Sequence, residues 1–84
     1  MVYVMLAEGF EEIEALTVVD VLRRAGIEVK TVSVSGSSVV TGSHNIPVVS
    51  DIQIADADLE NAEMIVLPGG MPGTENLYRS RELE

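Results

Sequence analysis

The sequence predicts an α/β domain built on a parallel sheet, and three observations support this prediction. Residues 2–7 and 64–67 are apolar without alternation, which is typical of strands buried on both faces. Residues 11–25 carry apolar side chains at helical spacing, and residues 27–34 alternate apolar and polar side chains as strands do. Strand, helix and strand in this order form a βαβ unit, in which the two strands are parallel.

The predicted helix has signals at both ends. Glu11, Glu12 and Glu14 lie in its first turns and two arginines lie at 23–24, so each end carries the charge that complements the helix dipole. Gly26 follows at the position where a glycine commonly ends a helix. We therefore expect the helix to end immediately before Gly26.

The second half of the sequence holds shorter elements. The alternation in 27–34 favours a strand with one wetter face, nearer a sheet edge than the first strand. Residues 39–41 and 46–49 flank a Gly-Ser-His-Asn segment and predict a small hairpin, whose second arm Pro47 confines to an edge or a bulge. Further predictions are an ambiguous short segment at 51–54, a helical turn at 58–62, a second turn at 74–77 and a helix start capped by Ser80.

The segment 64–67 predicts a central strand, yet only one substantial helix is available to cover the sheet. We expect one face of the sheet and the open edge of this strand to lack cover, because no later strand follows. The sequence is therefore interpreted as the N-terminal half of a larger α/β domain. The alternative is a complete small α+β domain that dimerises through the exposed strand.

Composition excludes several classes of protein. The chain has 84 residues, 46% of them hydrophobic, which suffices for one small domain or a part of one. Fourteen acidic and five basic residues give a net charge of −9, which argues against nucleic acid and anionic membranes as partners. There is no cysteine, so a disulfide, a thiolate metal site and a cysteine nucleophile are excluded within these residues. No secretory signal or membrane span is recognisable, and we expect a cytoplasmic location.

Candidate site residues lie where the two apolar strands end, because ligands bind beyond the carboxyl ends of strands in open parallel sheets. Gly69 and Gly70 could form an oxyanion nest from backbone N–H groups, or only a tight turn. Glu14 could face the sheet as a partly desolvated proton donor, away from the exposed face expected for Glu12, or it could be a solvated surface residue. His44, the only histidine, is left out of the site, and no metal or dinucleotide motif is present.

Three segments resemble the ThiJ/PfpI family, the superfamily that includes the Parkinson-linked protein deglycase. These are Ala-Glu-Gly-Phe-Glu-Glu-Ile-Glu at 7–14, Val-Asp-Val-Leu-Arg-Arg-Ala-Gly at 19–26, and Val-Leu-Pro-Gly-Gly at 66–70 with Gly73, Asn76 and Leu77 after it. The resemblance covers essentially the whole chain and implies the N-terminal half of a flavodoxin-like parallel-sheet sandwich. It also implies a homodimer.

The resemblance assigns roles to the candidate residues. Glu14 corresponds to the acid that hydrogen-bonds a reactive cysteine thiolate, and the Gly70 amide, with Gly69 shaping the turn, corresponds to half of an oxyanion hole. The cysteine itself would lie beyond Glu84, in the C-terminal half. The implied chemistry is cofactor-free attack on a 2-oxoaldehyde, removal of its protein adducts, or reversible cysteine oxidation. His44 stands where the family often has an arginine.

Two other classes compete with this interpretation. A non-catalytic interaction or chaperone-like module would act through exposed apolar surface. A phosphoacceptor receiver domain would need an aspartate at the end of a later buried strand, where this sequence has Pro-Gly-Gly.

Overall fold

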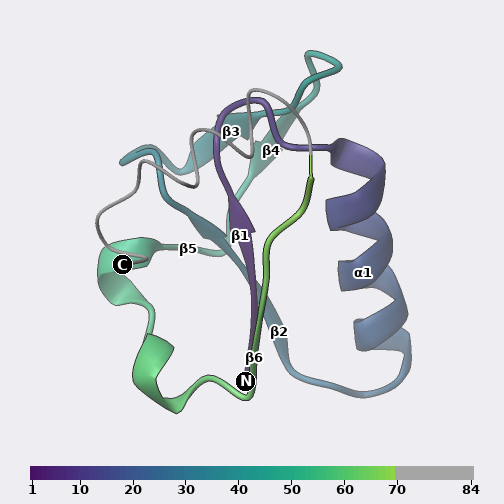
Figure 1. Cartoon of the computed structure of the whole chain (residues 1–84), viewed down its shortest axis with the longest axis vertical. Coiled ribbons are helices and arrows are strands. Elements are labelled where there is room, and N and C mark those ends of the chain that lie inside the picture. Colours follow the sequence, from purple (N-terminus) through teal and green to yellow (C-terminus); the bar gives the residue numbers. More distant parts are fainter. Residues whose placement is uncertain (70–84) are drawn as a thin grey trace.

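Four parallel strands form the central sheet of the computed structural model, which describes residues 1–69 (Figure 1). The strands are β1 (Val2–Leu6), β2 (Val29–Ser33), β5 (Ile52–Gln53) and β6 (Met64–Val66), and their order is β5-β2-β1-β6. All three pairings between neighbouring strands are parallel. The predicted α/β class is confirmed. The turns expected at 74–77 and after Ser80 lie outside the described residues, as does Gly70.

β1 occupies the middle of the sheet, as its unbroken apolar sequence predicts. It pairs with β2 from Val2↔Val29 to Leu6↔Ser33, and on its other side with β6 from Val2↔Met64. Every residue of β1 is buried. This burial follows from cover on both faces, which is the condition that selects a continuous apolar run over an alternating one.

α1 (Glu12–Arg24) connects β1 to β2 and matches the predicted helix. The Glu11 carboxylate caps its first turn by accepting a hydrogen bond from the backbone N–H of Ile13 at 2.9 Å. Gly26 follows with φ 78°, the left-handed conformation that glycine adopts at little cost. Both helix ends therefore lie where the local sequence signals place them.

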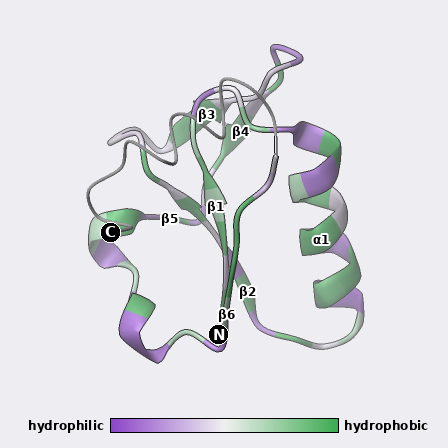
Figure 2. Ribbon diagram, in the orientation of Figure 1, coloured by the Kyte–Doolittle hydropathy of each residue, from purple (hydrophilic) through white to green (hydrophobic). Residues whose placement is uncertain are grey.

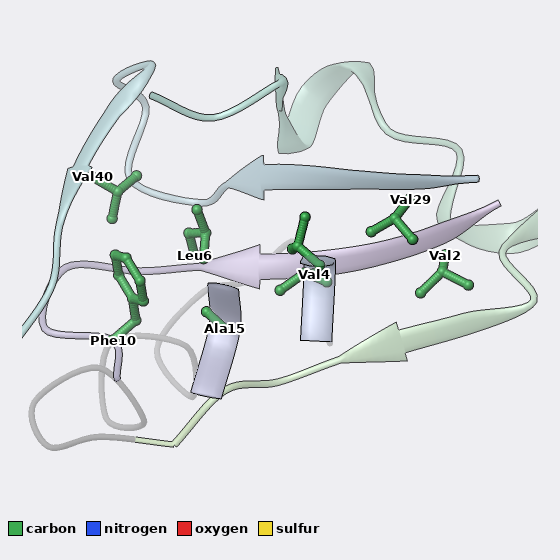
Figure 3. Packing of buried hydrophobic residues seen from close by; sticks show 8 residues of the cluster. Val2, Val4, Leu6, Phe10, Ala15, Val29 and Val40 are labelled. Atoms are coloured by element: carbon green, nitrogen blue, oxygen red, sulfur yellow. The ribbon is translucent and has the colours of Figure 1, made fainter. Parts of the chain in front are cut away.

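The two faces of the sheet carry separate apolar clusters. On the α1 face, buried side chains from β1, α1, β2 and β3 form one cluster, which has Phe10 and Val40 at one end and Val2 and Val29 at the other (Figure 3). On the opposite face, Tyr3, Met5 and Val32 pack against Ile54 and neighbouring residues. This second face is covered in part by two short 3-10 helices, η1 (Ile54–Asp56) and η2 (Leu59–Asn61) (Figure 1). The expectation that only one face could be covered was therefore wrong, because single turns also bury apolar side chains.

The predicted hairpin is confirmed as β3 (Val39–Thr41) and β4 (Pro47–Val49), which pair antiparallel in a sheet of their own. Within residues 1–69 each strand of this pair has a free edge, so Pro47 is tolerated as predicted. Val40 is the only fully buried side chain of the two strands, and it lies beside Phe10 and Leu6 (Figure 3). Val40 therefore anchors the hairpin to the main sheet.

The prediction of a wetter face on β2 was wrong. Thr31 and Ser33 are buried, and only Lys30 of this strand is exposed. The Asp51 carboxylate accepts hydrogen bonds from the Thr31 backbone N–H at 2.9 Å and from Arg23 at 2.8 Å, and the Thr31 hydroxyl accepts one from the Asp51 N–H at 2.8 Å. The buried polar side chain of Thr31 thus has its hydrogen bonds made by Asp51. In addition, β5 pairs with β2 and gives this strand a second neighbour in the sheet.

β6 differs from the central buried strand that its sequence predicts. Within residues 1–69 it lies at the edge of the sheet, with Met64 57% and Leu67 59% exposed. Figure 2 shows its apolar ribbon running beside β1. The described residues contain no element that covers its outer side, and this accounts for the difference. No described helix is long and apolar enough to span a membrane.

Candidate functional site

The carboxyl ends of β1 and β6 lie side by side, because the two strands are parallel neighbours. Residues 7–11 connect β1 to α1 at this edge, and Pro68 and Gly69 continue β6 there (Figure 1). Ligands of open parallel sheets bind at such an edge. The structure therefore brings together the two segments that the sequence singled out, which are more than fifty residues apart.

Two hydrogen bonds fasten the Pro68-Gly69 segment to the start of α1. The Gly69 backbone N–H donates to Glu14 Oε2 at 2.8 Å, and the Glu11 backbone N–H donates to the Gly69 carbonyl at 2.8 Å. The Glu14 side chain is therefore held at the end of β6, although the residue is exposed in the described part of the chain. Each of the two interpretations of Glu14 is correct in part, because the side chain is exposed to solvent and also accepts a hydrogen bond from Gly69.

Glycine is required at position 69 for this approach. A Cβ atom on Gly69 would lie 2.7 Å from Glu14 Oε2, closer than a Cβ atom approaches any non-bonded heavy atom. A larger residue would push the Glu14 carboxyl group away. Gly70, the predicted oxyanion-hole donor, lies outside the described residues.

The β3–β4 hairpin also reaches this edge of the sheet. Gly9, with φ 84°, donates its N–H to the Thr41 carbonyl at 2.8 Å, and the Glu8 carboxylate accepts from the Thr41 N–H at 3.3 Å. The connection between β3 and β4, residues 42–46, is thereby placed over the first turn of α1 (Figure 1).

Glu12 is the most buried acid of the site, with 2% of its surface exposed. Its Oε2 accepts hydrogen bonds from the backbone N–H groups of His44 at 2.7 Å and Ile46 at 3.3 Å. Its Oε1 accepts from the Ser43 hydroxyl at 3.4 Å and lies 2.9 Å from His44 Nδ1. The prediction that Glu12 is exposed was therefore wrong.

Helical spacing could have revealed the burial of Glu12. Positions 12, 15 and 19 share one face of a helix, and Ala15 and Val19 are both buried against the sheet. The prediction grouped Glu12 with the other glutamates of the first turn and overlooked that Glu12 lies on the same buried face of the helix as Ala15 and Val19. His44 was missed because its partner is 32 residues away and carries no local signal.

The surroundings of Glu12 and His44 change the pKa of both groups. Burial by itself raises the pKa of Glu12, but hydrogen bonds from the His44 ring and from backbone N–H groups outweigh burial and lower this pKa to about 2. The hydrogen bond to Glu12, with the charges of Glu12 and Glu11, raises the pKa of His44 above its ordinary value of 6.5. The lowered pKa of Glu12 favours its carboxylate form, and the raised pKa of His44 favours its imidazolium form.

The potential ligand atoms of Glu11, Glu12 and His44 lie within 4.8 Å of one another. The distance of 3.8 Å from His44 Nδ1 to Glu11 Oε2 and the donors already bound to Glu12 fit an ion pair with a surrounding hydrogen-bond network. We therefore interpret Glu12 and His44 as an ion pair with Glu11 beside it, and not as a metal site.

The parallel sheet, with α1 between β1 and β2 and the candidate site at the carboxyl ends of adjacent strands, is that of an open, flavodoxin-like α/β domain. Comparison with known proteins gives its family. The model of the DJ-1/PfpI family matches residues 1–84, and the chain belongs to this family.

Individual relatives agree with this assignment. Protein DJ-1 homolog B of Arabidopsis thaliana is 39% identical over 83 residues, which are 99% of this chain and 19% of that protein. The structure of a DJ-1 superfamily protein from Salmonella typhimurium superposes with a TM-score of 0.93 at 39% identity, covering 98% of this chain and 44% of that chain. Oxidised Toxoplasma gondii DJ-1 gives a TM-score of 0.93 at 41% identity, over 98% and 45% of the two chains. The chain thus spans less than half the length of these relatives.

Proposed function

We propose that this chain is the N-terminal part of a single DJ-1/PfpI domain whose C-terminal half supplies a nucleophilic cysteine. The complete domain would act without a cofactor on 2-oxoaldehydes or on their adducts with proteins, in a cytoplasmic response to stress. The observation that carries the proposal is the contact between Glu14 and Gly69, which brings the predicted acid to the predicted glycine turn.

The geometry of Glu14 suits a proton donor. Gly69 N–H already donates to Oε2, so a neutral carboxyl group would accept with this oxygen and carry its proton on Oε1. That proton would donate to a nearby cysteine sulfur and stabilise the thiolate. The thiolate would then attack the aldehyde carbon, and the backbone N–H of Gly70, in the turn that Gly69 shapes, would stabilise the charge that develops on oxygen.

Exposed apolar surface supports the C-terminal half as a partner. Met64 and Leu67 belong to a sequence segment typical of a buried strand, yet both are more than half exposed in residues 1–69. A further strand beside β6, with a helix over its outer face, would bury both side chains. The relatives, of which this chain spans less than half, have the additional length for such elements.

A groove on the outer face of α1 supports a homodimer. Its volume is about 410 Å³, and it is lined by Glu12, Ile13, Leu16, Thr17, Asp20 and Ile46. Ile13 is 73% exposed, and burial of such a side chain against a second copy would contribute about 1.5–3 kcal/mol. Sedimentation of the complete domain should show a dimer that Ile13→Asp weakens.

The catalytic proposal is tested with this chain joined to the C-terminal half of the domain. We expect one cysteine whose alkylation rate reports a thiolate near neutral pH, together with turnover of glyoxal. Glu14→Gln should raise the apparent pKa of this cysteine and lower turnover by about 10²-fold or more. The matched control is Glu28→Gln, because residue 28 precedes β2 at the opposite edge of the sheet. A cysteine that titrates like a free thiol in both proteins would contradict the proposal.

A non-catalytic interaction or chaperone-like module is the second candidate, and the exposed apolar side chains of α1, β4 and β6 favour it. Its signature would be binding of an apolar dye and concentration-dependent association, with no glyoxal turnover by the complete domain. Reversible cysteine oxidation is a third use of the same site, and the relative from Toxoplasma gondii is known in an oxidised form. Loss and recovery of the thiol under mild peroxide, without aldehyde turnover, would distinguish it.

A further inference from the structure

The connection between β3 and β4 closes around one buried carboxylate. Residues 43–46 direct four donors at Glu12, two of them backbone N–H groups. Gly42 opens the connection, and a Cβ atom there would lie 2.2 Å from Glu12 Cδ. The backbone at residue 42 thus lies so close to the Glu12 side chain that there is no room for a Cβ atom.

The two charged partners differ in their access to solvent. The Glu12 side chain is 3% exposed, whereas the His44 side chain is 62% exposed. The imidazole can therefore exchange its proton with bulk water while the carboxylate that it contacts stays shielded. Histidine is also the side chain whose ordinary pKa lies in the physiological range, and His44 is the only histidine of the chain.

The charges that face this pair are negative. Glu11 Oε2 lies 3.8 Å from His44 Nδ1, Glu8 binds the Thr41 N–H at the base of the connection, and Asp20 lines the groove beside Glu12. Of the arginines within residues 1–69, Arg23 binds Asp51 and Arg24 binds Asp20. Because these arginines are paired elsewhere, His44 is the cation that forms the ion pair with Glu12 in the described part of the chain.

We propose that Glu12 and His44 form a pH-dependent latch that holds the β3–β4 connection on the first turn of α1, beside the Glu14–Gly69 contact. With His44 protonated, the ion pair at 2.9 Å closes the connection over Glu12. Loss of that proton removes the positive charge of the ion pair and leaves only hydrogen bonds from uncharged donors to the carboxylate, so the connection opens more often. This inference does not depend on cysteine chemistry and goes beyond the proposed function.

The pH range follows from the direction of the shifts. Glu12 stays ionised through the neutral range because its pKa is lowered to about 2. The pKa of His44 is raised on folding, so its stabilisation is complete below its ordinary value of 6.5 and is lost as pH rises through the higher value of the folded protein. The latch is therefore closed at mildly acidic pH and loosened at alkaline pH.

The test is an NMR titration of the 84-residue chain with hydrogen exchange measured at the backbone N–H groups of His44 and Ile46. We expect His44 to titrate above 6.5, and the protection of both N–H groups, corrected for intrinsic exchange, to fall across the same midpoint. Glu12→Gln should move the His44 midpoint down toward 6.5, whereas the control Glu28→Gln should leave it in place.

The N–H groups of β1 and β2 report whether each variant is folded. Equal His44 midpoints in the unaltered chain and in folded Glu12→Gln would overturn the proposal, as would unchanged protection at His44 and Ile46 across the midpoint. If Glu12→Gln does not fold, His44→Gln decides the question. In that variant the pH dependence of protection at Ile46 must disappear, and its persistence would refute the latch.

Discussion

Replacing Val40 by alanine measures how strongly the hairpin is attached to the sheet. Val40 is 0% exposed and is the only fully buried side chain of β3 and β4, whereas Val49 on the same hairpin is 71% exposed. Val40→Ala removes two buried carbon atoms, at about 0.8 kcal/mol each, and leaves a cavity. We expect it to lower the free energy of unfolding by about 2–3 kcal/mol, from a total of about 4–13 kcal/mol for a chain of this size.

Val49→Ala is the matched control, because it makes the same chemical change in the same hairpin. Any loss of intrinsic strand propensity is common to both variants, so the difference between them reports burial alone. Val49→Ala should change the free energy of unfolding by about 0.5 kcal/mol or less.

Urea unfolding followed by circular dichroism measures both variants. With a slope of about 1 kcal/mol/M, Val40→Ala should lower the midpoint by about 2–3 M and leave the slope unchanged. Equal midpoints for the two variants would refute the reasoning that Val40 anchors the hairpin.

Three further predictions concern the site and the acid stability. Gly69→Ala should displace the Glu14 carboxyl group, seen as a changed side-chain NMR signal, and should lower glyoxal turnover of the complete domain with little loss of stability. Asp51→Asn should remove a stabilisation that is present above the ordinary pKa of 3.8 and is lost as pH falls through the lower pKa of the folded protein. Its urea midpoint should therefore fall less between pH 5 and pH 3 than that of Asp20→Asn, whose carboxylate lies on the surface. Gly42→Ala should displace the buried carboxylate of the latch and lower the protection of the His44 and Ile46 N–H groups at every pH.

The parts of the fold that local sequence determines were predicted correctly. α1 begins beside its acidic first turn and ends before Gly26, because dipole complementarity and a left-handed glycine act within a few residues. β1 was recognised because burial on both faces leaves no position for a polar residue. The contact of Glu14 with Gly69 follows from topology, since parallel neighbours end at the same edge.

The errors have a common physical origin in contacts between distant segments. Thr31 was expected to be wet, but its partner Asp51 lies twenty residues away and satisfies both its N–H and its hydroxyl. Glu12 was expected to be exposed, but donors more than thirty residues away make its burial favourable. The burial of a polar residue can be predicted only when its hydrogen-bond partners are known, and for Thr31 and Glu12 the tertiary fold supplies these partners.

The difference at β6 has another cause. The sequence of 64–67 is that of a strand covered on both faces, and no segment within residues 1–69 provides this cover. An apolar strand that the described residues leave open indicates a contact surface of matching apolar character. The charge of −9 bears on the same point, because mutual repulsion disfavours non-specific association between copies of the chain through this surface. The exposed edge of β6 therefore supports the proposal that this strand is an interface for the C-terminal half of the domain.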